Sequence, residues 1–123
     1  MRHSSPRLRE LLQLRQRLDW EIDEERTRLG FTMAERTQER IIENAATLFV
    51  VSVDDIMGKS RAPRFADPRH IVMWMLRREG LSYPQIGRLF NRDHTTIMYG
   101  CRRVERMPAL MAVAEKLSKK VAA

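Results

Sequence analysis

The sequence of 123 residues has few of the features that mark secreted or membrane proteins. Its one cysteine, Cys101, excludes a disulfide within the chain, so a reducing cytoplasm is the expected compartment. No apolar run approaches the roughly 20 residues that a membrane-spanning helix needs. The N-terminus carries Arg2 and His3 but lacks the apolar segment of a secretory signal, so secretion is not expected.

Side-chain groupings that carry catalysis are also missing from the sequence. The histidines, which are His3, His70 and His94, have no metal-ligand spacing, and one cysteine completes no metal site. Cys101 falls on the apolar side of a predicted helix, where a thiol is inert. The G-x-x-x-x-G-K-[ST] phosphate loop is absent. We therefore expect neither an enzyme nor a bound cofactor.

Basic residues are present in excess, and they gather in one part of the chain. The formal net charge is +7, which favours a polyanionic partner. Residues 1–58 hold 9 basic and 11 acidic side chains, a net charge of −2. Residues 59–106 hold 11 basic and 4 acidic side chains, a net charge of +7, and residues 107–123 add +2. The excess of positive charge therefore lies in the second half.

Hydrophobic periodicity predicts an all-α chain, because no β pattern, repeat or low-complexity tract is present. Residues 6–29 form a charged amphipathic helix that Gly30 ends. Its apolar stripe is Leu8, Leu11, Leu18, Ile22 and Leu29, with Arg15 and Glu25 interrupting it. Two interpretations are open: an arm that packs on the rest of the domain or frays, or a short coiled coil that forms a homodimer.

Capping residues and prolines set the limits of the other helices. The predicted helices are 33–49 with Thr32 and Glu35 as capping box, 53–57 with Ser52 and Asp55, a helix capped by Asp67 that starts at Pro68 and ends at Glu79, one capped by Ser82, one capped by Asp93, and 109–120 after Pro108. Core-facing residues on these helices include Ile41, Ile42, Ala45, Leu48, Phe49, Ile86, Leu89, Phe90, Ile97, Cys101 and Val104. Together they predict a small helical bundle.

Two of these helices form a helix-turn-helix. The first covers Ser82 to Phe90, Asn91-Arg92 makes the turn, and the second opens at Asp93. Such a unit places the start of its second helix in the DNA major groove. The first turn of that helix holds hydrogen-bonding side chains, which are His94, Thr95 and Thr96. Asp93 is either only the N-cap or also an acceptor for a cytosine amino group.

A basic loop, Lys59 to Ala66, precedes the helix-turn-helix. It is either a solvated surface loop or an arm that enters the minor groove, where arginine is attracted to the negative potential. Arginines that follow it are candidates for phosphate contacts, which fix register without reading sequence. These are Arg69, Arg77, Arg78 and Arg88.

Several motifs in order resemble one family. They are Ser52-Val53-Asp54-Asp55-Ile56 followed by Lys59 and Arg61, Pro68-Arg69, Ser82-Tyr83-Pro84-Gln85-Ile86-Gly87, Arg92-Asp93-His94-Thr95-Thr96-Ile97, and Cys101-Arg102-Arg103-Val104. From about Ile41 to Met107 the chain resembles the C-terminal DNA-binding domain of the bacterial replication initiator DnaA. A generic helix-turn-helix would match one of these motifs but not all of them at this spacing.

The resemblance implies binding to the DnaA box, TTATNCACA. It implies major-groove contacts by Asp93, His94, Thr95 and Thr96, and a minor-groove contact by Arg61. It implies that Arg69 and Arg77 lie at phosphates or adjoining bases. The full set predicted near phosphates is Lys59, Arg64, Arg69, His70, Arg77, Ser82, Arg92, Arg102 and Arg103. The expected organisation is an arm over 1–31, the DNA-binding domain over 32–107, and a C-terminal helix over 108–123.

The sequence departs from the family at three points. Asn91 stands alone where the family has a longer turn, His70 replaces a common glutamine, and Asp67 stands where a basic residue is common. These differences predict altered affinity or box preference. An initiator also carries a large ATPase module, which 123 residues cannot hold. We expect a short separate protein or a fragment, and the start at Met1 with its charged helix favours the former.

These observations predict a nucleoid-associated protein that binds double-stranded DNA at DnaA-box-like sites without ATPase activity. It would regulate transcription or replication initiation. The alternative is a protein-interaction module that acts on the initiator, or on another protein, through residues 6–29.

Overall fold

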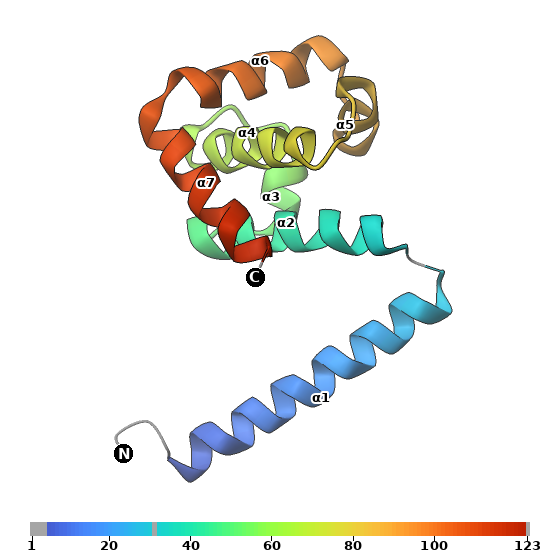
Figure 1. The fold of residues 1–123 in the computed structure, drawn as a ribbon. Coiled ribbons are helices and arrows are strands. Elements are labelled where there is room, and N and C mark those ends of the chain that lie inside the picture. Colours follow the sequence, from blue (N-terminus) through green and yellow to red (C-terminus); the bar gives the residue numbers. More distant parts are fainter. Residues whose placement is uncertain (1–4, 31, 123) are drawn as a thin grey trace. The chain divides into compact units, whose positions relative to one another are not determined.

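The computed structural model describes residues 5–30 and 32–122, and every regular element in that part of the chain is an α-helix (Figure 1). The helices are α1 (Pro6–Arg28), α2 (Met33–Phe49), α3 (Val53–Met57), α4 (Pro63–Arg78), α5 (Tyr83–Phe90), α6 (His94–Arg106) and α7 (Pro108–Ala122). The all-α prediction is confirmed. The chain divides into two compact units, one up to Glu35 and one from Arg36 onward.

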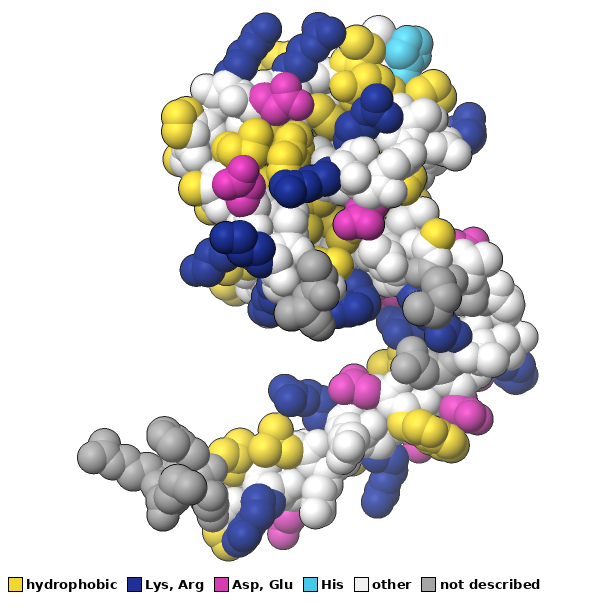
Figure 2. All heavy atoms as spheres, in the orientation of Figure 1, with side chains coloured by type: hydrophobic (Ala, Val, Ile, Leu, Met, Phe, Trp, Pro, Cys, Tyr) yellow, Lys and Arg dark blue, Asp and Glu magenta, His cyan; other side chains and the backbone are white. Residues whose placement is uncertain are grey.

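The first unit is essentially one long helix. Ser5 caps α1 by accepting a hydrogen bond from the backbone N–H of Leu8 at 3.0 Å, and Pro6 occupies the first helical position. Gly30 has φ +79°, the left-handed conformation that ends the helix as predicted. Apolar and charged side chains alternate along the surface of this helix (Figure 2).

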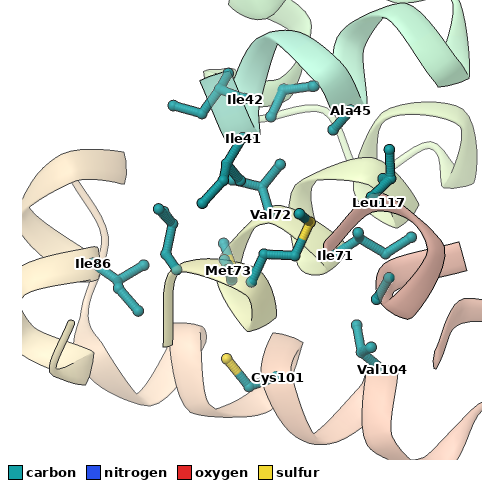
Figure 3. Close-up of a cluster of buried hydrophobic side chains, with 14 of the residues drawn as sticks. Ile41, Ile42, Ala45, Ile71, Val72, Met73, Ile86, Cys101, Val104 and Leu117 are labelled. Atoms are coloured by element: carbon teal, nitrogen blue, oxygen red, sulfur yellow. The ribbon is translucent and has the colours of Figure 1, made fainter. Parts of the chain in front are cut away.

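The second unit has a buried core organised around α4. Ile71, Val72 and Met73 of this helix are fully buried. Around them lie Ile41, Ile42 and Ala45 of α2, Ile86 of α5, Cys101 and Val104 of α6, and Leu117 of α7 (Figure 3). Helix α4 contacts α3, α5, α6 and α7. It is therefore the support on which the helix-turn-helix rests.

Capping boxes begin α2, α3 and α5; the sequence predicts the first two, and for α5 it predicts the cap Ser82. In each, a hydroxyl accepts the N–H three residues later, and that residue's side chain accepts the N–H of the cap. The capping residues are Thr32, Ser52 and Ser82. Helix α7 begins at Pro108 and extends past the predicted end at Lys120.

The predicted start of α4 is wrong. The helix begins at Pro63, not Pro68, so the last four residues of the predicted basic loop, 63–66, are helical. Backbone N–H groups of Phe65 and Ala66 donate to the carbonyl oxygen of Ala62 and close the first turn. Pro63 already has the fixed φ of a first helical residue, so the helix starts there without a side-chain cap. Asp67 is consequently an interior residue that is available for a tertiary contact.

Two predicted core residues are exposed. Leu48 has an exposed fraction of 46% and Leu89 of 37%. Each lies near the end of its helix, where the neighbouring positions Phe49 and Phe90 turn inward instead. Successive side chains on a helix are about 100° apart, so at these two helix ends only the second residue of each apolar pair points into the core.

Candidate nucleic-acid interface

Helix α6 has a buried apolar face and an exposed polar N-terminal turn. Ile97, Cys101 and Val104 are buried against the core, as predicted. Burial raises the pKa of the Cys101 thiol to about 11, so this group is protonated at neutral pH. The four residues at the start of the helix are exposed, and these are Asp93, His94, Thr95 and Thr96. The polar side chains predicted to contact bases therefore lie together on the surface.

Asp93 holds the N-terminal turn of α6 in place. Its carboxylate accepts a hydrogen bond from the backbone N–H of Thr95 at 3.2 Å, so the predicted N-cap is confirmed. The same Oδ1 lies 2.9 Å from Nδ1 of His94. This pair fixes the imidazole beside the helix start, where the helix dipole also favours an anion.

The turn between α5 and α6 depends on close backbone contact. Asn91 has φ +53° and ends α5 in the left-handed conformation that asparagine tolerates. The N–H of Arg92 then donates to the carbonyl oxygen of Gly87 at 2.8 Å. A Cβ atom on Gly87 would lie 2.6 Å from the carbonyl oxygen of Arg92. Only glycine permits this approach.

Arg69 is buried, with an exposed fraction of 4%, although it was predicted to contact phosphate. Its guanidinium donates to three carbonyl oxygens, those of Asp55 at 2.9 Å, Ile56 at 2.7 Å and Ser60 at 2.6 Å. Burial lowers the pKa of this group, and Arg92 lowers it further. Arg69 thus holds the end of α3 and the beginning of the basic loop against α4.

Arg92 reaches the same loop from the helix-turn-helix. One of its terminal nitrogens donates to the carbonyl oxygen of Gly58, and the other donates to that of Phe90 at 3.4 Å. The side chain is half-buried, which lowers its pKa. The loop that carries Lys59 and Arg61 is therefore attached at Gly58 to the turn before α6.

A groove of about 770 Å³ separates the basic loop from α6. It is lined from the loop side by Lys59 and Arg61, from α4 by Asp67 and His70, and from the α6 side by Asp93, Thr96, Tyr99 and Arg103, among others. Arg61, predicted to enter the DNA minor groove, thus lines the same groove of the protein as Asp93 and Thr96, which are predicted to contact the DNA major groove.

The floor of this groove contains an ion pair and a neutral histidine. Arg103 lies 2.8 Å from Oδ1 of Asp67 and 3.0 Å from Nδ1 of His70. Burial, reinforced by Arg103 and Arg69, lowers the pKa of His70 to about 4. The imidazole is therefore neutral at pH 7, and its Nδ1 accepts the hydrogen bond from Arg103. Tyr99 packs edge-to-face on the same ring.

The other predicted phosphate-contacting residues lie in different places. Arg102 is exposed on α6, and Arg77 is exposed with its guanidinium over the Tyr83 ring. Ser82 uses its hydroxyl to cap α5. Arg64 stacks on Phe65 and lines a separate shallow pocket with Asp55 and Ser52. Arg64 therefore does not line the groove.

The sequence analysis did not predict that Arg69 and Arg92 hold the basic loop. It also did not predict that Tyr99 packs on His70 or that Asp67 pairs with Arg103. A signal for Arg69 was present, because it precedes Val72, Met73 and Leu76 at helical spacing and so shares their buried stripe. No comparable pattern marks Arg92, whose partner is distant in sequence.

In the part of the chain that the structure describes, no three or more His, Cys, Asp or Glu side chains are grouped so that they could hold a metal ion. None of the helices described there combines the length and the apolar character that a membrane span requires.

Comparisons with known proteins agree with the geometry. The family described as "Bacterial dnaA protein helix-turn-helix" matches residues 38–104, which include the whole of the groove. The proteins named "Chromosomal replication initiator protein DnaA" include one from Acholeplasma laidlawii, 40% identical over 74 residues that are 58% of this chain and 17% of that protein. Another, from Clavibacter sepedonicus, is 44% identical over 69 residues, 54% of this chain and 14% of that protein. The chain spans less than a fifth of the length of these relatives.

Proposed function

Since the chain belongs to the bacterial DnaA helix-turn-helix family, we propose that it binds double-stranded DNA specifically, at sites like the DnaA box. The observation that carries this proposal is the exposed polar turn at the start of α6, standing on a buried apolar face. Asp93, His94, Thr95 and Thr96 would contact base edges in the major groove. The Thr methyl groups would pack on thymine methyl groups.

The groove beside α6 would receive the sugar-phosphate backbone. Arg61 would enter the minor groove on one side while α6 occupies the major groove on the other. Lys59, Arg77 and Arg102 would contact phosphates, since their side chains are exposed. Arg69 and Arg92 would act indirectly, by holding the loop that carries Arg61.

Occupancy of such sites would be the biological activity. A chain that fills DnaA-box-like sites with no ATP-driven step would regulate transcription, or would compete with the initiator at its boxes. Either role needs only affinity and specificity, both of which the charge distribution and the polar turn of α6 support.

Substitutions in α6 test base reading. His94→Ala or Thr95→Ala should cost about 1–3 kcal/mol on a cognate duplex and relax specificity. Arg77→Ala is the matched control, because loss of a phosphate contact should weaken all duplexes about equally. An unchanged ratio of cognate to scrambled affinity in the His94→Ala protein would contradict base reading by this residue.

A second candidate function is protein interaction through α1. The favouring observation is the row of exposed leucines on this helix. Here the partner would be the initiator or another protein. Deleting residues 1–30 would abolish the cellular activity in that case, whereas the pair of substitutions Arg61→Ala and His94→Ala would leave it intact. The reverse result supports DNA binding as the activity.

A further inference from the structure

Four exposed apolar residues of α1, together with Leu29 at its C-cap, follow a heptad spacing, whereas the exposed residues Leu12, Leu14 and Trp20 lie outside it. Steps of three and four residues connect Leu8, Leu11, Arg15, Leu18, Ile22, Glu25 and Leu29 without a gap. The five apolar members have exposed fractions between 38% and 64%. We call these seven positions the α1 seam. A seam with this spacing packs against a second helix of the same kind in a coiled coil.

The two charged residues of the α1 seam have opposite signs and stand symmetrically in it. Arg15 lies five positions before Trp20, and Glu25 lies five positions after it. Two α1 helices side by side in a parallel arrangement would place Arg15 against Arg15 and Glu25 against Glu25. An antiparallel arrangement centred at position 20 places Arg15 of each copy against Glu25 of the other.

We infer that this protein forms a homodimer through an antiparallel coiled coil of two α1 helices. In this register the other seam residues that overlap with the second helix are apolar, and each faces an apolar residue of that helix. Leu11 lies opposite Leu29 of the second copy, and Leu18 lies opposite Ile22 of the second copy. The interruptions that weaken a parallel dimer become two ion pairs, which select both the orientation and the register.

Other charge interactions along α1 are weaker than the proposed ion pairs between Arg15 and Glu25. Within one helix Glu25 already pairs with Arg28, but both side chains are exposed, and such pairs contribute at most about 1 kcal/mol. The antiparallel register also places Asp19 near Asp19 of the second copy, and Glu21 near Glu21 of the second copy. These flanking side chains are exposed, so water and salt screen their repulsion, whereas the seam is partly dehydrated.

The dimer would carry two DNA-binding units. At a rise of 1.5 Å per residue, the two Leu29 residues lie about 27 Å apart along the coiled coil, so the chains leave it at opposite ends. This consequence, unlike the dimer itself, rests on the proposed function. A dimer of this kind binds duplexes with two boxes more tightly than duplexes with one, because the second contact is intramolecular.

Charge reversal in the full-length protein tests the orientation. Sedimentation equilibrium of the native chain should show a dimer. Arg15→Glu and Glu25→Arg, made singly, should each raise the dimer dissociation constant at least about tenfold, which corresponds to 1.4 kcal/mol. The double variant should restore the dimer, because it exchanges the two charges of each pair. A parallel coiled coil gives no loss in either single variant, because like charges face each other in all of these proteins.

A seam variant and an off-seam variant with the same new side chain complete the test. Ile22→Glu should give a monomer, and Trp20→Glu, on the outer side of the helix, should remain a dimer. Circular dichroism of both checks that the protein is folded. A monomeric native chain, or single charge reversals that leave the dimer intact, would overturn the inference. Affinity for one box, measured on the Arg15→Glu protein, reports separately on the proposed function, since that residue lies outside the DNA-binding unit.

Discussion

The guanidinium of Arg92 donates a hydrogen bond to the carbonyl oxygen of Gly58, across 34 residues of sequence. This contact joins the turn before α6 to the start of the basic loop. Arg61, the residue proposed to enter the minor groove, follows Gly58 in this loop, so the contact from Arg92 helps to position the loop relative to the start of α6. The side chain of Arg92 thus connects the loop that carries Arg61 with the start of α6.

Arg92→Gln should weaken cognate DNA binding about tenfold or more. Loss of a hydrogen bond from a charged donor costs about 1.5–3 kcal/mol, and here it frees the loop that carries Arg61. Fluorescence anisotropy on a single-box duplex measures the effect. Arg88→Gln is the matched control, since it removes the same charge from an exposed position on α5. Equal losses in both variants would mean that Arg92 contributes only charge.

Arg69→Ala should lower the free energy of unfolding by roughly 3 kcal/mol, because it leaves three carbonyl oxygens without their donor. Urea denaturation monitored by circular dichroism measures this change. Arg102→Ala, at an exposed position, should change stability by no more than about 0.5 kcal/mol. If the two variants were equally stable, the anchoring role of Arg69 would be wrong.

Gly87→Ala should disturb the helix-turn-helix. The added Cβ would approach a backbone oxygen that cannot move without opening the turn, so a cost of about 1–3 kcal/mol is expected. DNA affinity should fall as well, since the start of α6 shifts. The neighbouring substitution Arg88→Ala, at an exposed position, is the control for stability and should change it by no more than about 0.5 kcal/mol. A variant as stable and as tightly bound as the native chain would contradict the close packing of this turn.

Stability should fall as the pH drops from about 6.5 to about 4. In this interval the unfolded chain binds a proton at His70 that the folded chain does not, because burial, Arg103 and Arg69 keep the folded pKa at about 4 and Asp67 opposes them only weakly. His70→Gln removes this part of the pH dependence. Urea denaturation at pH 7 and pH 4.5 compares the two proteins. The same decrease in both would exclude His70 as its source.

Asp67→Asn should strengthen binding to DNA of any sequence. The carboxylate lies 2.8 Å from Arg103 on the floor of the groove, so its removal frees a guanidinium for phosphate. The slope of log affinity against log salt should steepen by about one. Glu105→Gln removes one exposed negative charge from α6 and is the matched control. A gain no larger than that of the control would argue against competition between Asp67 and phosphate.

Local signals in the sequence predicted most of the helices. Side-chain caps within three residues of a helix start depend on neighbours alone, so Ser52 and Ser82 marked their helices correctly. The start of α4 was mistaken because the cap that precedes Pro68 was a stronger local signal than Ala62 before Pro63. Contacts between distant segments, such as that of Arg92 with Gly58, depend on how α3 and α5 pack on α4, and no local pattern encodes that packing.

Fluorescence anisotropy on two duplexes across a salt series distinguishes sequence-specific binding from attraction to phosphate. One duplex carries a single DnaA box, and the other has the same composition in scrambled order. Sequence-specific binding predicts an affinity for the box at least ~10³-fold tighter than for the scramble, at the low end for specific binders. Equal affinity for both duplexes, falling steeply with salt, would show attraction to phosphate alone and would contradict sequence-specific binding at this box.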